Sequence, residues 1–198
     1  DYSLDGLQGR EMKDLTVGIL GTGRIGATVA RELSGFGCRL VAYDIHENPS
    51  LNGLVKYMSL DDVYKQADII TLHMPLFEST YHMINEESIA KMKKGVIIIN
   101  CARGALSDAH ALIKGIETEK IGALGIDVLE NEEEIVHKNL KTDIFSNRDM
   151  AYLRQFKNVV HTQHMAFYTD AAVKSMVECG ISCLMDMAEG KTTPLQLC

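Results

Sequence analysis

Side chains that can hold an anion or move a proton follow several apolar runs of this 198-residue chain. Arg103 stands just after the run that ends at Asn100. Acidic residues follow the run that ends at Val128, and histidines stand at the ends of two other runs. The candidate acids are Glu130, Glu132, Glu133 and Glu134, and the candidate histidines are His73, His161 and His164.

These three residue types suit the reduction of a ketone that lies next to a carboxylate. A guanidinium can bind the carboxylate through two parallel hydrogen bonds and polarise the neighbouring carbonyl. A histidine can donate the proton that follows a hydride onto oxygen. A carboxylate beside the imidazole orients it and favours its protonated form.

A source of hydride is indicated by three glycines between residues 16 and 44, in "TVGILGTGRIGATVARELSGFGCRLVAYD". Gly21 permits a tight turn from strand to helix, Gly23 lets the backbone approach a diphosphate, and Gly26 lets the helix pack closely on the strand. The free N–H groups near Arg24 and Ile25, at the positive end of the helix, would donate to the phosphates.

Asp44 ends the second apolar run, eighteen positions beyond Gly26. This is close to the offset of about 20 residues at which an acid accepts hydrogen bonds from a ribose of NAD. Asp44 would repel the additional phosphate of NADP, and residues 45–48 supply no arginine to bind one. The motif therefore favours NAD, although a solvated carboxylate at the end of a strand is the alternative for Asp44.

The order of the elements predicts how these residues are brought together. Short apolar runs alternate with helical segments, which predicts an α/β fold: a doubly wound, parallel, six-stranded sheet of the Rossmann type with helices on both faces. The ends of its strands would meet at one edge, where ligands bind. The expected strands are Thr16–Leu20, Arg39–Tyr43, Ile69–His73, Val96–Asn100, Gly122–Val128 and Val159–Thr162. The expected helices are Arg24–Leu33, Leu60–Gln66, Glu86–Met92, Asp108–Glu117 and Ala151–Phe156.

The last part of the chain differs from the rest. Residues 169–189 form a long, methionine-rich helical pattern that no strand follows, and its apolar stripe must cover something. We therefore expect a dinucleotide-binding domain at 1–165 and, at 166–198, a C-terminal helix and tail that would pack on a domain absent from this chain.

Composition narrows the possible partners and the compartment. A formal net charge of −7 without a basic cluster argues against nucleic acid and anionic membranes. No apolar run reaches the ~20 residues of a membrane span, and the first residues lack a signal-peptide pattern. Five cysteines without a C-x-x-C pair indicate reduced thiols in a cytoplasmic protein. Cys179 and Cys183 fit small buried apolar residues better than a metal pair, and no metal site is expected.

With these motifs in order along nearly the whole chain, the sequence resembles the NAD-dependent D-2-hydroxyacid dehydrogenases. The matching stretches are "GTGRIG" with Asp44, "HMPLFESTYHMI", "INCARGAL", "GIDVLENEEE" and "NVVHTQHMAFYT". The long insert after "VLENEEE" and the "AFYT" after the histidine are similar to the D-lactate dehydrogenase branch. They argue against a D-3-phosphoglycerate or formate dehydrogenase.

The resemblance implies roles for individual residues. Arg103 would bind the substrate, His164 would donate the proton, and Glu132 would be its partner. Glu130 or Glu133 remains an alternative for the partner, and His161 or His73 for the proton donor. Gln163 replaces the proline that the family usually has before this histidine, which would loosen its placement. The implied contacts to the cofactor, beyond the glycine motif and Asp44, are His73, Met74, Pro75, Thr80, Cys101, Ala102 and Asp127.

The resemblance also implies a function. The expected reaction is the reduction of a 2-keto acid to a D-2-hydroxy acid, with D-lactate as the first candidate product and D-2-hydroxyisocaproate or another larger acid as the second. The family's substrate domain would precede residue 1, so this chain alone would bind NAD but be nearly inactive. A homodimer formed through this domain is expected. The alternative from another class is an NADH-sensing scaffold like the corepressors that resemble these enzymes.

Overall fold

The computed structural model describes residues 2, 4, 8–133, 135–139 and 147–193. The chain forms two compact units, Asp1–Gln163 and His164–Cys198, and each is considered by itself. The first unit holds all the strands of the described part of the chain, and the second holds one long helix.

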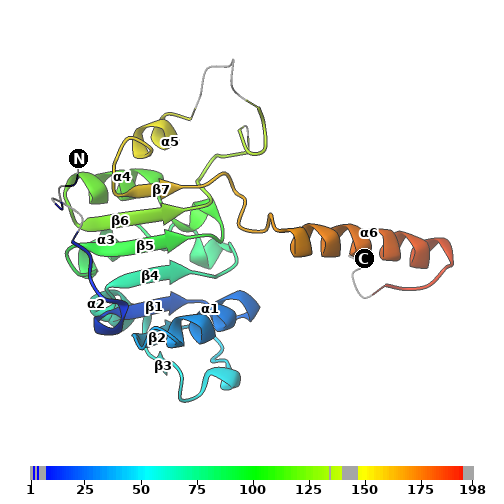
Figure 1. Cartoon of the computed structure of the whole chain (residues 1–198), viewed down its shortest axis with the longest axis horizontal. Helices are drawn as coiled ribbons and strands as arrows, with labels where there is room; N and C mark the ends of the chain where they lie inside the picture. Colours follow the sequence, from blue (N-terminus) through cyan, green and yellow to red (C-terminus); the bar gives the residue numbers. More distant parts are fainter. Residues whose placement is uncertain (1, 3, 5–7, 134, 140–146, 194–198) are drawn as a thin grey trace. The chain divides into compact units, whose positions relative to one another are not determined.

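The first unit is built on one seven-stranded sheet in the order β3-β2-β1-β4-β5-β6-β7 (Figure 1). Every neighbouring pair is parallel, so the carboxyl ends of the strands meet at one edge. The chain order reverses between β1 and β4, which is where ligands bind in sheets of this type. The strands are β1 (Thr16–Leu20), β2 (Arg39–Tyr43), β3 (Lys56–Tyr57), β4 (Ile69–Leu72), β5 (Val96–Asn100), β6 (Ile121–Ile126) and β7 (Val159–His161).

Helices connect the strands, and polar side chains fix where several of them begin. Ser59 Oγ accepts a hydrogen bond from the amide of Asp62, and Asn85 and Asp108 accept equivalent bonds from later amides. The α-helices of this unit are α1 (Arg24–Ser34), α2 (Leu60–Gln66), α3 (Glu86–Lys91), α4 (Ala109–Glu117) and α5 (Arg148–Leu153). Short 3-10 turns are η1 (Met12–Asp14), η2 (Pro49–Leu51), η3 (Glu78–Thr80) and η4 (Gly104–Leu106).

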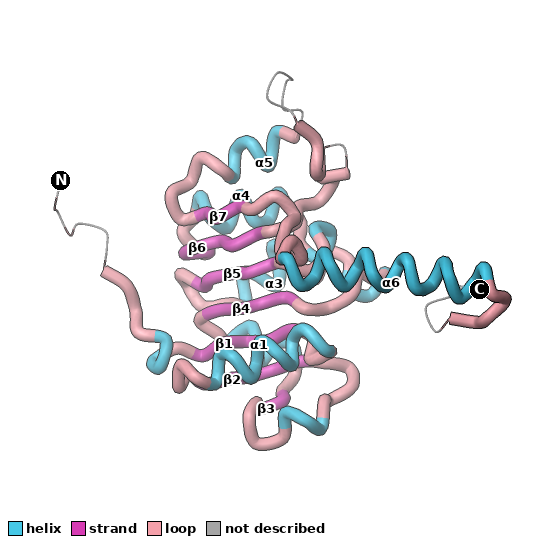
Figure 2. The backbone as a smooth tube through the Cα atoms, turned by 45° about the vertical axis from the view of Figure 1, so that its right-hand side comes forward, coloured by secondary structure: helices cyan, strands magenta, loops and turns pink. Residues whose placement is uncertain are grey.

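The two faces of the sheet are covered unequally. One face packs against α2, α3, α4 and α5 and contains the larger core. On the other face α1 covers β1 and β2 (Figure 2), and no described helix of this unit covers β5 to β7 there. Ile97 and Ile99 are therefore only half-buried on that face, and Val160 is 66% exposed.

The predicted α/β class and parallel Rossmann sheet are confirmed, but the predicted number of six strands is wrong. The seventh strand, β3, is two residues long and pairs with β2 at the edge of the sheet. A run of Lys56 and Tyr57 is too short to give the alternating or continuous apolar pattern of a strand. Helix α5 also begins at Arg148, three residues before the predicted start, because Asn147 caps it through the amide of Met150.

The second unit contains α6 (Asp170–Ala188), which begins after Thr169 accepts a hydrogen bond from the amide of Ala172. None of its residues is buried, and several of its large apolar side chains, such as Val177 and Leu184, are more than half exposed. Cys179 is exposed and Cys183 is partly buried, so the prediction of two small buried residues is wrong for this unit. None of the described helices is long and apolar enough to cross a lipid bilayer.

Candidate functional site

The glycine turn between β1 and α1 has backbone geometry that side chains would prevent. Gly21 has φ +91°, a conformation that residues with a Cβ rarely adopt. A Cβ atom there would also lie 2.8 Å from the carbonyl of His73. At Gly26, a Cβ atom would overlap the carbonyl oxygen of Gly21. The first and third glycines are therefore required by the packing of the turn itself.

Gly23 differs, because a Cβ atom there would meet no protein atom within 4 Å. Gly23 is the N-cap of the 11-residue helix α1, and no described side chain caps that end. The N–H groups of the first helical turn have no partner within a helix, and the positive end of the dipole favours an anion there. An open space, uncapped amides and a missing side chain together fit the diphosphate of a dinucleotide.

Asp44 lies directly beside this turn, as its position after β2 predicts. Its Oδ2 accepts hydrogen bonds from the amide of Thr22 at 2.6 Å and from the Thr22 hydroxyl at 3.0 Å. Its Oδ1 accepts from the amide of His46 at 3.1 Å. Burial alone would raise the pKa of Asp44, but these hydrogen bonds outweigh it and lower the pKa below its usual value. The carboxylate is thus an ionised acceptor, as contact with ribose hydroxyls requires.

A cleft of about 680 Å³ extends from the glycine turn to Arg103 along the ends of β1, β4 and β5. Its walls include nine of the predicted site residues, together with Leu76, which sequence analysis did not select. The lining residues are Gly23, Arg24, Ile25, His73, Met74, Pro75, Leu76, Cys101, Ala102 and Arg103. The volume lies in the range of pockets that hold small ligands and cofactors.

Two titratable side chains in this cleft, His73 and Cys101, are held uncharged. Burial lowers the pKa of His73 to about 4, and its Nε2 lies 3.0 Å from the hydroxyl of Thr71. Burial and then the nearby charge of Asp127 raise the pKa of the Cys101 thiol. His73 is therefore neutral at physiological pH, which argues against it as a proton donor.

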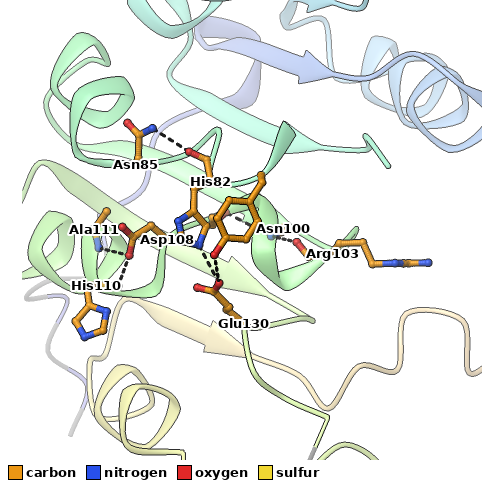
Figure 3. Close-up of polar contacts among 10 residues, drawn as sticks. His82, Asn85, Asn100, Arg103, Asp108, His110, Ala111 and Glu130 are labelled. Carbon is orange, nitrogen blue, oxygen red and sulfur yellow. Dashed lines mark hydrogen bonds and ion pairs between the residues drawn. The ribbon is translucent and has the colours of Figure 1, made fainter. Parts of the chain in front are cut away.

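Arg103 stands at the substrate end of the cleft, in the turn after β5. Its backbone is fixed because Asn100 Nδ2 donates to the Arg103 carbonyl at 2.9 Å, while its exposed guanidinium donates to the Ala102 carbonyl at 2.7 Å. In Figure 3 the guanidinium extends away from the other labelled side chains. A Cβ atom at Gly104 would overlap the Leu129 carbonyl, so the turn with Arg103 packs closely against the segment after β6.

The structure gives different partners to the two central acids. Glu130 Oε1 lies 2.9 Å from Nε2 of His82 (Figure 3). It also accepts a hydrogen bond from the Tyr81 hydroxyl at 3.0 Å, and the rings of Tyr81 and His82 are stacked. Glu132 instead accepts, through Oε2, a hydrogen bond from the amide of Leu129 at 3.0 Å. Glu130 is thus occupied in joining the loop after β4 to the loop after β6.

The other predicted residues lie outside the cleft lining. Thr80 bridges its own loop, because its hydroxyl donates to the Pro75 carbonyl and accepts from the Phe77 amide. Asp127 is buried and accepts from the Thr162 hydroxyl at 2.5 Å.

Among the remaining candidates, Nε2 of His161 has no hydrogen-bond partner, and burial followed by the charge of Arg154 lowers its pKa. His164 belongs to the second unit and has φ +54°, and Glu134 lies outside the described residues. Within the described part of the chain, no group of three potential ligands could hold a metal ion.

The fold and the glycine turn define a dinucleotide-binding domain of the Rossmann class. A sequence model described as the D-isomer specific 2-hydroxyacid dehydrogenase, NAD binding domain, matches residues 2–166. The chain therefore belongs to the D-isomer specific 2-hydroxyacid dehydrogenases and contains their NAD binding domain. The predicted family and cofactor are confirmed.

Individual relatives agree with this family. The chain is 51% identical over 179 residues to an aromatic 2-oxoacid reductase of Clostridium sporogenes, an alignment that covers 90% of this chain and 54% of that protein. It is 43% identical to a D-lactate dehydrogenase of Lactobacillus delbrueckii subsp. bulgaricus, covering 96% and 58% of the two chains.

Solved structures give the same result. The NAD complex of a D-isomer specific 2-hydroxyacid dehydrogenase from Lactobacillus delbrueckii ssp. bulgaricus has a TM-score of 0.90 at 38% identity and covers 98% of this chain. This chain corresponds to 59% of that structure and, as with the curated relatives above, spans little more than half of the matched protein.

Proposed function

We propose that the protein containing this chain reduces 2-oxo acids to D-2-hydroxy acids with NADH, and that residues 1–165 form its NAD-binding domain. The observation that carries this proposal is the continuous cleft from the glycine turn to Arg103. One end offers backbone donors and an ionised acid for a dinucleotide, and the other offers a guanidinium for a carboxylate.

The residues of the first unit would hold the cofactor along this cleft. The amides at Gly23, Arg24 and Ile25 would bind the diphosphate, and Asp44 would accept from the ribose next to adenine. His73, Met74 and Cys101 would face the nicotinamide end, where bound NADH supplies the hydride. Thr80 and Asp127 would act indirectly, by holding the loops that carry these walls.

Arg103 would bind the substrate carboxylate and polarise its carbonyl, and His164 would give the carbonyl oxygen its proton. Glu132 is the proposed partner of His164. The pairing of Glu130 with Tyr81 and His82 supports this choice over Glu130. His164 has a left-handed backbone, with φ +54°. A proline at position 163 would not by itself impose this conformation on residue 164.

The substrate domain would come from the part of the relatives that this chain does not match. Residues 166–198 would pack on it, which is supported by the exposed apolar side chains of α6. The open face of β5 to β7, with Val160, supports contact with another segment or a second subunit of a homodimer. Free cysteines in the described part of the chain support a cytoplasmic location.

The test uses the full-length protein, assayed with NADH and a panel of 2-oxo acids. Arg103→Gln and His164→Gln should each lower kcat/KM by roughly 10²–10⁴-fold, while affinity for NADH stays near that of the wild type. Glu132→Gln should shift the pH profile of kcat because the partner charge is lost. If Arg103→Gln retained full turnover, the proposed site would be wrong.

A second candidate concerns the substrate alone. The 51% identity to an aromatic 2-oxoacid reductase favours a larger 2-oxo acid over pyruvate. Comparing kcat/KM for phenylpyruvate, 2-oxoisocaproate and pyruvate would decide between a larger 2-oxo acid and pyruvate as the substrate. A preference for pyruvate would favour D-lactate as the product.

A further inference from the structure

Thr22 lies between the first two glycines and is almost completely buried, with 1% of its surface exposed. Its hydroxyl and amide both bind Asp44 Oδ2. Two further side chains reach it: Tyr57 donates to its Oγ1 at 2.9 Å, and Asn48 Nδ2 donates to its carbonyl at 2.8 Å. Every polar group of Thr22 is therefore occupied.

The hydrogen bonds form a chain whose direction is determined at both ends. The backbone N–H of Asn48 can only donate, and it donates to the Tyr57 hydroxyl oxygen at 2.9 Å. The Tyr57 hydroxyl therefore donates onward to Thr22, and the Thr22 hydroxyl donates to Asp44, which as a carboxylate can only accept. Hydrogen bonds in such a series polarise and strengthen one another.

Strand β3 explains how Tyr57 reaches this position. Tyr57 is paired with Ala42 across the β2–β3 ladder, two positions before Asp44. The amide of Met58 continues the ladder by donating to the Ala42 carbonyl. The short edge strand thus places the phenol next to the glycine turn and the acid that follows β2.

We propose that Tyr57 is a positioning residue for the adenosine end of the dinucleotide site. It orients the Thr22 hydroxyl onto Asp44 and holds the 44–48 loop, so that the turn that binds phosphate and the acid that binds ribose keep a fixed spacing. This inference rests on the proposed NAD-binding role, and it assigns Tyr57 no contact with the cofactor.

The test is a calorimetric titration of the purified protein with NADH, ADP-ribose and NADPH. Tyr57→Phe should weaken binding of NADH and ADP-ribose by the same factor, roughly tenfold, because both contain the diphosphate and the adenosine ribose. Binding of NADPH should weaken less, since Asp44 does not favour it, so the preference for NADH over NADPH should fall. Tyr152→Phe removes a hydroxyl bound to Glu117 on another part of the surface and is the matched control.

A double-mutant cycle separates this role from a general effect on structure. Thr22→Val should lose at least as much NADH affinity as Tyr57→Phe, and the double variant should lose no more than Thr22→Val alone, because both break one chain. Thr22→Ser, which keeps the hydroxyl, should retain most of the affinity. If Tyr57→Phe did not fold, the Thr22→Ser and Thr22→Val pair would test the same chain from its other end.

Two results would overturn the proposal while leaving NAD binding intact. These are NADH and ADP-ribose affinities of Tyr57→Phe within twofold of wild type, or additive losses in the double variant. A wild-type protein that bound no NADH would instead overturn both the proposed function and this inference.

Discussion

The two ends of the cleft are built differently. At the glycine turn, Thr22 is buried, and Asp44 accepts two hydrogen bonds from Thr22 and one from the amide of His46. At the other end, the guanidinium of Arg103 is exposed and bonds the carbonyl of the residue before it. The end at the glycine turn is therefore organised by residues of this unit, whereas the end at Arg103 presents an exposed side chain.

The largest expected effect is at the glycine turn. Gly26→Ala places a methyl group on the Gly21 carbonyl oxygen. The methyl group would also lie 3.3 Å from His73 Cβ, so the helix cannot relieve the overlap by shifting towards His73. We expect a loss of about 3 kcal/mol or more in the free energy of unfolding, since a backbone overlap exceeds ordinary overpacking. Urea unfolding would measure it.

Gly180→Ala is the control for this prediction, because Gly180 is also a helical glycine but has no neighbour within 4 Å of an added Cβ. It should stabilise α6 by up to about 1 kcal/mol through helix propensity. Equal behaviour of the two variants would show that the close packing of Gly26 does not exist in solution.

Gly23→Ala sharpens the contrast within the same turn. The added methyl group meets no protein atom, so the free energy of unfolding should change by no more than about 0.5 kcal/mol. It would occupy the space proposed for the diphosphate, and NADH affinity should fall roughly 10- to 100-fold through lost charge-assisted hydrogen bonds. Normal NADH affinity in a folded Gly23→Ala protein would place the phosphates elsewhere.

The difference between the two ends also explains what could be predicted from the sequence. The roles of Gly21, Gly26 and Asp44 depend on one strand–turn–helix–strand unit, in which local spacing determines the geometry. The closeness of Glu130 to Tyr81 joins residues 49 positions apart. No local pattern reports such a contact, and the choice between Glu130 and Glu132 had to come from the family resemblance.

The missed strand shows a different limit. Lys56 and Tyr57 form a strand because they pair with β2 and because the Tyr57 hydroxyl forms hydrogen bonds with Thr22 and Asn48. Both causes are tertiary, and two residues are too few for periodicity to reveal them. For the same reason Thr22 could be noticed only as the variable position between two glycines.

The stability of the chain is expected to depend on pH through His73, which lines the cleft. The pKa of His73 is about 4 in the folded chain, against its ordinary value of 6.5. The unfolded chain therefore binds a proton that the folded chain does not, so stability should fall as the pH drops from 6.5 towards 4. At about 1.4 kcal/mol per unit, the full difference is on the order of 3 kcal/mol.

Urea unfolding between pH 4.5 and 7.5 would measure this change, and His73→Gln should reduce its slope by up to one proton. His161, whose pKa is also lowered, contributes in the same direction and remains in the variant. Asp44 acts elsewhere: its lowered pKa gives stability that is lost only as the pH falls below the ordinary value of 3.8. An unchanged slope in His73→Gln would mean that folding does not lower the pKa of His73.

The smallest expected effect distinguishes the two ends directly. Cys101 is exposed and lines the cleft near Arg103, while Cys179 is exposed on α6 in the second unit. Iodoacetamide should label Cys101 slowly, because the partial burial of its sulfur within the cleft and the charge of Asp127 raise the pKa of the thiol. With NADH at ten times its Kd, labelling of Cys101 should slow about tenfold by mass action, and labelling of Cys179 should not change. Mass spectrometry of the two peptides would report both rates.

ADP-ribose makes this experiment a test of position, because it should bind at the adenosine end without a nicotinamide to cover Cys101. It should therefore protect Cys101 much less than NADH does at equal occupancy. Equal protection by both ligands would mean that binding at the glycine turn closes the whole cleft, and the two ends would then behave as one site. Protection by NADH alone would show that the adenosine end binds independently of the end where Arg103 lies.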